Sequence, residues 1–234
     1  LAAVALRGSP TFLIQPVRTF CLLTAMVYQL IYFPLRGRAG SVRLLLKDNE
    51  INFEEVNCGG ESWRSHWKPQ MQFGQVPCLK DGDQNIVQSN SILRYLARKH
   101  DLYGANDLEA VQIDMINDGA EDLRVKYIIL IYKNYEDGKE EYISQLPAQL
   151  QPFENLLSKN GADKSGCCVG NKISFADYNL IDMLDAHLVL SPKALDDFPV
   201  LSAYYKKIIS RPRIAEYHAT SAFKNSPVNA NGKQ

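Results

Sequence analysis

The stretch YFPLRGRAG (32–40) combines groups that suit the recognition of an anion. Tyr32 ends an apolar strand pattern, and Arg36 and Arg38 flank a glycine just before a helical pattern begins. A phenol donates a hydrogen bond, guanidinium groups carry positive charge, and a helix N-terminus presents unpaired N–H groups. Together they indicate an anion site. Spacing alone leaves open a plainer interpretation, in which the tyrosine only packs and the arginines lie in a solvated loop.

Two further segments could complete such a site. In QVPC (75–78), Pro77 restricts the segment to a sheet edge or a strand start, because proline has no N–H for the ladder. If the peptide bond before Pro77 is cis, an extended peptide could pair with the backbone of Val76. Gln88 and Ser89 begin the next helical pattern, with Ser89 as the predicted N-cap, and offer a second anion site. The alternative is a strand, a turn and a capped helix with no ligand.

The elements that must position these residues form a first region from 26 to 102. Its predicted order is β-α-β followed by β-β-α, which indicates a small α/β domain with a mixed sheet. The expected elements are strands at 27–33 and 51–57, a hairpin at 75–88, and helices at 40–49 and 89–100.

A second region, 108–234, has only helical periodicity and predicts an all-helical domain. Its most clearly marked helix spans 173–190: Ser174 and Asp177 resemble a capping box, and apolar residues nearly all round predict that this helix is central and buried. One long helix is expected around 116–131. Another, around 142–153, should be started, bent or interrupted by its two prolines.

The composition limits the classes of function. The chain has 234 residues, with 26 basic and 26 acidic side chains, and this balance argues against binding nucleic acid or an anionic membrane surface. The five cysteines include no C-x-x-C pair, which argues against a disulfide framework and favours a cytoplasmic location. No histidine spacing indicates a metal site.

Residues 1–25 contain two arginines and no acidic residue, which is typical of a mitochondrial transit peptide. A second interpretation takes Met26 as the native start, because it stands immediately before the first strand. We expect residues 1–25 to be an extension outside the fold.

Six motifs in register resemble the pi class of cytosolic glutathione transferases. They are YFPLRGR, QVPCLKDGD, IVQSNSILRYLARK, NDGAEDLRVKY, ISFADYNLIDML and the terminal NANGKQ. The similarity covers essentially all of residues 26–234. It implies a thioredoxin-like N-terminal domain with a mixed four-stranded sheet, an all-α C-terminal domain and a homodimer. It also implies an enzyme that conjugates glutathione, a co-substrate rather than a cofactor, to small hydrophobic electrophiles.

The resemblance assigns roles residue by residue. Tyr32 matches the catalytic tyrosine, and Asp122 matches an acid that reaches the ligand's amine across the dimer interface. The other glutathione positions are Arg38, Trp63, Lys68, Gln75, Val76, Pro77 (a cis-proline), Gln88 and Ser89. The electrophile positions are Phe33, Leu35, Ile128, Tyr132 and Ala230. Arg36 is expected to pair structurally rather than touch the ligand.

Two positions depart from the family pattern. Met71 stands where the pi class often carries a reactive cysteine, so we expect no thiol-based control through this loop. Phe73 replaces the tyrosine that anchors the partner subunit, and a phenylalanine can fill an apolar socket equally well.

The physical chemistry agrees with an enzymatic role for Tyr32. A free thiol with a pKa near ~8.5 is only a few per cent thiolate at neutral pH, and a phenol that donates a hydrogen bond to sulfur favours the thiolate. Two alternatives keep the same fold: a ligand carrier or kinase regulator without catalysis, and a glutathione-dependent isomerase or peroxidase. A pure binder would not need a group that activates sulfur.

Overall fold

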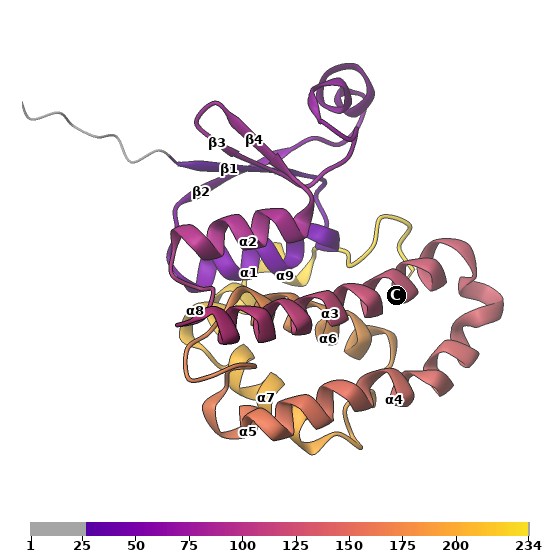
Figure 1. Ribbon diagram of the computed structural model, residues 1–234. Coiled ribbons are helices and arrows are strands. Elements are labelled where there is room, and N and C mark those ends of the chain that lie inside the picture. The colour runs from indigo at the N-terminus through magenta and orange to yellow at the C-terminus, as the bar shows by residue number, and fades with distance from the viewer. Residues whose placement is uncertain (1–26, 234) are drawn as a thin grey trace, which may run out of the picture.

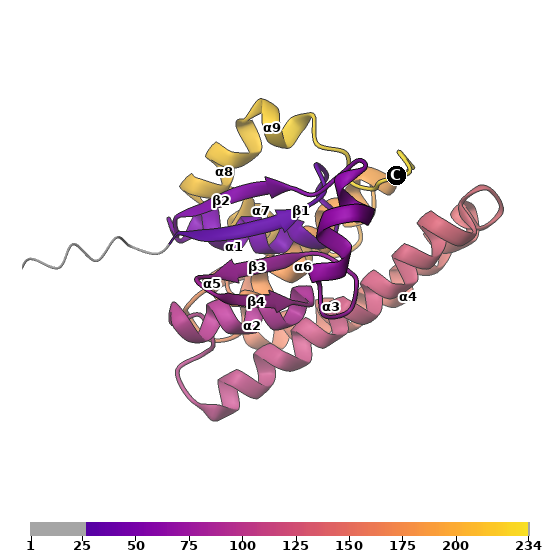
Figure 2. The ribbon, with the colours of Figure 1, turned by 90° about the horizontal axis from the view of Figure 1, so that it is seen from above.

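The computed structural model describes residues 27–233, and its N-terminal part is built on a four-stranded mixed sheet. The central strand β1 (Tyr28–Tyr32) pairs in parallel with β2 (Phe53–Asn57) and antiparallel with β3 (Cys78–Asp81). The edge strand β4 (Gln84–Val87) completes the order β2-β1-β3-β4, which can be followed in Figure 2. The predicted mixed sheet is therefore confirmed. The predicted extension, residues 1–25, lies outside the described residues.

Two helices cover one face of this sheet and separate it from the helical part (Figure 1). They are α1 (Gly40–Asp48) and α2 (Ser89–Lys99). The apolar stripe of α1, including Val42, Leu45 and Leu46, is completely buried. Because burial of one such side chain contributes about 1.5–3 kcal/mol, this helix is fixed firmly and so is the loop that precedes it.

The start of α2 differs from the prediction. Gln88, with φ +71°, is the N-cap residue and makes no side-chain cap hydrogen bond, while Ser89 is already the first helical residue. The reason is the short connection: β4 ends at Val87, so the chain must turn into the helix within one residue. Ser89 is thereby buried at the helix N-terminus.

All the regular elements in the described residues of the C-terminal part are helices. Its helices are α3 (Asp107–Lys133), α4 (Tyr135–Asn160), α5 (Ala162–Ser165), α6 (Phe175–Leu190), α7 (Pro199–Ile209), α8 (Pro212–Ala219) and α9 (Ser221–Lys224). Both prolines expected to interrupt the second pattern lie inside α4. Pro147 and Pro152 are exposed, so water can bind the carbonyl groups that lose their helical partners.

Helix α6 is the buried centre of this part, as predicted. It has a capping box in which the Asp177 carboxylate accepts from the Ser174 backbone N–H at 2.7 Å. The same carboxylate accepts from the Cys168 backbone N–H and the Tyr204 hydroxyl, each at 2.7 Å. The fully buried acid thus joins three segments, and all of its hydrogen bonds are internal.

The C-terminal segment lies across the loop that follows β1, as a strap. The backbone N–H groups of Arg36 and Gly37 donate to the carbonyls of Pro227 and Val228, at 2.9 and 3.1 Å. Further along, the buried Asn229 donates to the Tyr127 hydroxyl at 2.8 Å. The strap therefore connects the end of β1 to helix α3. No helix between residues 27 and 233 is long and apolar enough to cross a bilayer.

Candidate active site

The hydroxyl of Tyr32 sits at the end of β1 with its acceptor side occupied. The backbone N–H of Arg38 donates to it at 3.0 Å, which leaves the phenolic proton free to be donated to a ligand. Burial raises the pKa of Tyr32 above its ordinary value, although the hydrogen bond from Arg38 acts to lower it. The phenol therefore stays neutral near physiological pH and acts as a donor.

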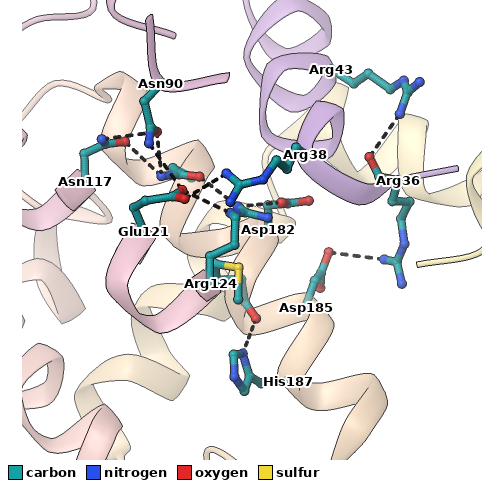
Figure 3. Close-up of polar contacts among 12 residues, drawn as sticks. Arg36, Arg38, Arg43, Asn90, Asn117, Glu121, Arg124, Asp182, Asp185 and His187 are labelled. Atoms are coloured by element: carbon teal, nitrogen blue, oxygen red, sulfur yellow. Dashed lines mark hydrogen bonds and ion pairs between the residues drawn. The ribbon is translucent and has the colours of Figure 1, made fainter. Parts of the chain in front are cut away.

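The loop around this hydroxyl is held by Arg43 of α1. Its guanidinium donates to the carbonyl of Leu35 at 2.7 Å and pairs with Glu55 of β2 at the same distance. It also donates to the carbonyl of Arg36 at 3.4 Å (Figure 3). Gly37 has φ +41°, and a Cβ there would lie only 2.5 Å from the Tyr32 hydroxyl oxygen. The close approach of this backbone to the phenol therefore requires glycine.

Tyr32 lines a cavity of about 250 Å³, named here the tyrosine cavity, between the loop after β1, helices α3 and α6, and the strap. Among the residues predicted for the electrophile, Leu35, Ile128 and Tyr132 line it. Ala230 lies at its rim, where its backbone N–H donates to the Tyr132 hydroxyl at 3.1 Å. Phe33 does not line it: its ring packs edge-on against Trp63, with centroids 5.2 Å apart. The wall also includes Arg36, Arg124 and Asn229, which the sequence did not place there.

A second cavity of about 220 Å³, the edge cavity, opens where β3 and α2 begin. It brings together the predicted residues Arg38, Gln75, Val76, Pro77, Gln88 and Ser89. The bond between Val76 and Pro77 is cis. Arg38 lines both cavities, so they adjoin at this residue. A ligand lying in the edge cavity can therefore extend to the hydroxyl of Tyr32.

Three other predicted residues do not line the edge cavity. Trp63 packs beside Phe33, and the Lys68 side chain lies against Gly74, whose Cβ would be 3.4 Å from the lysine Cε. Asp122 faces a separate groove between α3 and α4, named here the α3–α4 groove, with a volume of about 670 Å³. Asp122 therefore points away from this subunit's own edge cavity.

A buried network of charges joins the two parts of the chain behind the site (Figure 3). Glu121 of α3 pairs with Arg38 at 2.8 Å and accepts from Asn90 of α2 at 3.2 Å. On its other side Arg124 pairs with Asp182 of α6 at 2.9 Å and with Asn179 at 2.8 Å. Apart from Arg38, none of these residues was predicted from the sequence. The motif NDGAEDLRVKY places Glu121 and Arg124 one helical turn apart, and this spacing could have indicated that a charged pair lies on one face of α3.

The described cysteines are not placed for redox chemistry. Cys58 and Cys78 are buried in a small apolar cluster with Ile31 and Met71, and burial raises the pKa of each thiol to about 11. The adjacent Cys167 and Cys168 are also buried, and burial raises both of their pKa values. The four thiols thus stay protonated and shielded. Residues 27–233 contain no cluster of side chains able to hold a metal ion.

The fold and the site define a class of protein that comparisons with known families identify. Residues 28–98 match the glutathione S-transferase N-terminal domain, and residues 121–221 match the glutathione S-transferase C-terminal domain. The chain therefore belongs to the glutathione S-transferase family.

Similar proteins place it in the pi class of that family. It is 50% identical over 208 residues to glutathione S-transferase P 1 of Bufo bufo, covering 88% of this chain and 99% of that protein. Identity to glutathione S-transferase P of Homo sapiens is 49% with the same coverage. The solved pi-class glutathione S-transferase of Onchocerca volvulus matches with a TM-score of 0.85 and 46% identity, over 89% of this chain and all of that one.

Proposed function

We propose that this protein transfers reduced glutathione to hydrophobic electrophiles, with Tyr32 as the catalytic residue. The observation that carries the proposal is the Tyr32 hydroxyl, which accepts from the Arg38 backbone N–H and therefore has its own proton available for the sulfur of a bound glutathione. The thiolate attacks the electrophilic carbon, a C–S bond forms, and the leaving group departs with its bonding pair. The thiol proton passes to solvent when the thiolate forms.

Glutathione would occupy the edge cavity. Gln88 and Ser89, at the N-terminus of α2, suit its γ-glutamyl carboxylate, with Arg38 nearby. The backbone of Val76, beside Gln75 and Pro77, suits antiparallel pairing with the cysteinyl part. Trp63 and Lys68 remain proposed ligands of the glycyl carboxylate, which would reach them beyond the cavity. The electrophile would occupy the tyrosine cavity against Leu35, Ile128 and Tyr132, with Phe33 and Ala230 at its borders.

Conjugation is tested with glutathione and chlorodinitrobenzene. The expected result is saturable formation of the thioether together with a thiolate absorbance band for bound glutathione at neutral pH. Binding of glutathione by calorimetry without any conjugation or thiolate band would favour a non-catalytic carrier. Turnover of only a hydroperoxide or an isomerisable substrate would favour the second alternative, a glutathione-dependent peroxidase or isomerase. A cytoplasmic location and domain limits of 26–102 and 108–234 remain predictions.

We also propose that two copies associate through Phe73. This side chain is 68% exposed beside the edge cavity, while the α3–α4 groove offers Met115, Leu123 and Phe153 as apolar walls. Insertion of Phe73 of one copy into this groove of the other would bury both surfaces. It would also carry the groove residue Asp122 towards the other copy's edge cavity.

Phe73→Asp should convert the dimer to monomer, because a carboxylate in the apolar groove would be desolvated without a partner. Sedimentation of the parent and the variant measures this. Val189→Asp is the matched control, since Val189 of α6 is also exposed, at 41%, and lies outside both the edge cavity and the α3–α4 groove. If both variants keep the sedimentation coefficient of the parent, Phe73 is not the anchor.

Gly37→Ala should lower both stability and the conjugation rate. The alanine would adopt an unfavourable positive φ, and its Cβ would displace the Tyr32 hydroxyl. We expect a loss of about 1–3 kcal/mol in the free energy of unfolding. Gly161→Ala is the control, because Gly161 has φ +67° with nothing within 4 Å of a Cβ. Equal conjugation rates in the two variants would contradict the role given to this close approach.

A further inference from the structure

Three arginines line the tyrosine cavity, and they differ in how their guanidinium groups are paired. Arg38 pairs with Glu121 at 2.8 Å, and Arg124 with Asp182 and Asn179 at 2.9 and 2.8 Å. Arg36 makes no side-chain hydrogen bond to any residue between 27 and 233, and its Nε is buried without a partner. Its side chain is only 13% exposed. Because buried donors normally have acceptors, Arg36 stands out from its two neighbours.

The groups around Arg36 contact its guanidinium without accepting hydrogen bonds from it. Asp185 of α6 has an oxygen 3.9 Å from Nη1, beyond hydrogen-bond distance, and the ring of Phe223 lies 5.0 Å from the guanidinium carbon. The hydrogen bond that Asp185 does accept comes from Tyr205 of α7. The acid is therefore held towards α7, and its contact with Arg36 is the wide one drawn in Figure 3. The guanidinium has donors left for a ligand in the cavity that it lines.

We propose that Arg36 is a specificity-determining residue of the electrophile site, which favours electrophiles carrying a carboxylate over their uncharged analogues. The proposal rests on the function proposed above. The chemistry of conjugation is the same for both kinds of substrate: sulfur bonds to carbon and the leaving group departs. Arg36 contributes only binding, as a charged donor to the carboxylate remote from the reacting carbon.

Asp185 gives the preference a dependence on pH. The groups facing it are Arg36 from the loop after β1, Tyr205 from α7, His218 from α8, and Asp182 from its own helix. Burial raises the pKa of Asp185 to about 6 and lowers that of His218 to about 4, so His218 stays neutral while Asp185 titrates. As pH falls through 6, Asp185 becomes neutral and no longer offsets the charge of Arg36. The preference for an anionic electrophile should then increase.

The test compares chlorodinitrobenzoate with its methyl ester, which share one reacting carbon and one leaving group. The readout is the ratio of their kcat/KM values, acid over ester, in the full-length protein with saturating glutathione. Arg36→Met should lower this ratio by about tenfold, mainly through KM of the acid, and Arg36→Lys should restore part of it. Arg98→Met is the control for net charge, because Arg98 is exposed on α2 and does not line the cavity.

Several results would overturn the inference. One is an unchanged ratio in Arg36→Met. Another is an equal fall for both substrates, which indicates a structural role only. If Arg36→Met does not fold, the test uses the parent protein alone. Its acid-over-ester ratio of kcat/KM should rise severalfold as the pH is lowered from 7.5 to about 5.5. A ratio that does not change with pH would contradict the proposal. Turnover of chlorodinitrobenzene distinguishes failure of the proposed function from failure of this inference. If the protein does not turn over chlorodinitrobenzene, the proposed function is wrong. If it does, but shows no preference for the acid over the ester, only this inference is wrong.

Discussion

The Tyr32→Phe variant is expected to bind glutathione nearly as well as the parent and to conjugate it on the order of 10- to 100-fold more slowly. The physical reason is the lost hydrogen bond to sulfur. A hydrogen bond to a charged group contributes about 1.5–3 kcal/mol, and each 1.4 kcal/mol corresponds to about one pKa unit of the bound thiol. The variant also loses the hydrogen bond that the Arg38 backbone N–H donates to the phenol at 3.0 Å, but its ring remains packed in the core.

The pH profile separates this explanation from general damage to the site. In the parent, burial keeps the Tyr32 phenol protonated, so the rise of kcat/KM with pH should follow the bound thiol. In the variant the rise should move to higher pH by about 1–2 units, towards the pKa of free glutathione. Tyr28→Phe is the control, since Tyr28 lies on the same strand with its hydroxyl 3.1 Å from His100. An unshifted profile in Tyr32→Phe would remove Tyr32 from its role.

Arg124→Met is expected to cost about 3–5 kcal/mol of the free energy of unfolding, the largest effect on stability predicted here. Its guanidinium, only 7% exposed, pairs with Asp182. Removing one partner leaves a buried carboxylate uncompensated, and that carboxylate also packs on Gly40, whose Cβ would lie 2.0 Å from its oxygen. The start of α1, and with it the loop that carries Arg38, should therefore loosen.

Denaturant unfolding of parent and variant measures this loss. The control is Arg213→Met, which also removes an arginine paired with two carboxylates, Glu50 and Glu216. Those pairs are exposed to solvent, so the control should unfold with the parent. A loss below about 1 kcal/mol in Arg124→Met would show that the buried network does not hold the two parts together.

The sequence was most informative where one local pattern dominates. The capping box of Ser174 and Asp177, and the apolar surround of α6, correctly predicted a buried helix because short-range hydrogen bonding and periodicity decide both. The β-α-β and β-β-α order likewise predicted the mixed sheet. Local rules did not decide whether Pro147 and Pro152 start, bend or interrupt a helix, and α4 continues through both of them with their side chains exposed. They also placed Ser89 at the N-cap, whereas a one-residue connection makes it the first residue of α2.

By itself, the sequence determined the family and the order of the elements, because these depend on residue types and short spacings. Only the tertiary structure decided which arginines are paired. Arg36 and Asp185 are far apart in the chain, as are Arg124 and Asp182, and no local pattern relates them. Packing of α6 against α3 and against α1 sets those distances, and it leaves the guanidinium of Arg36 with unused donors at the wall of the tyrosine cavity.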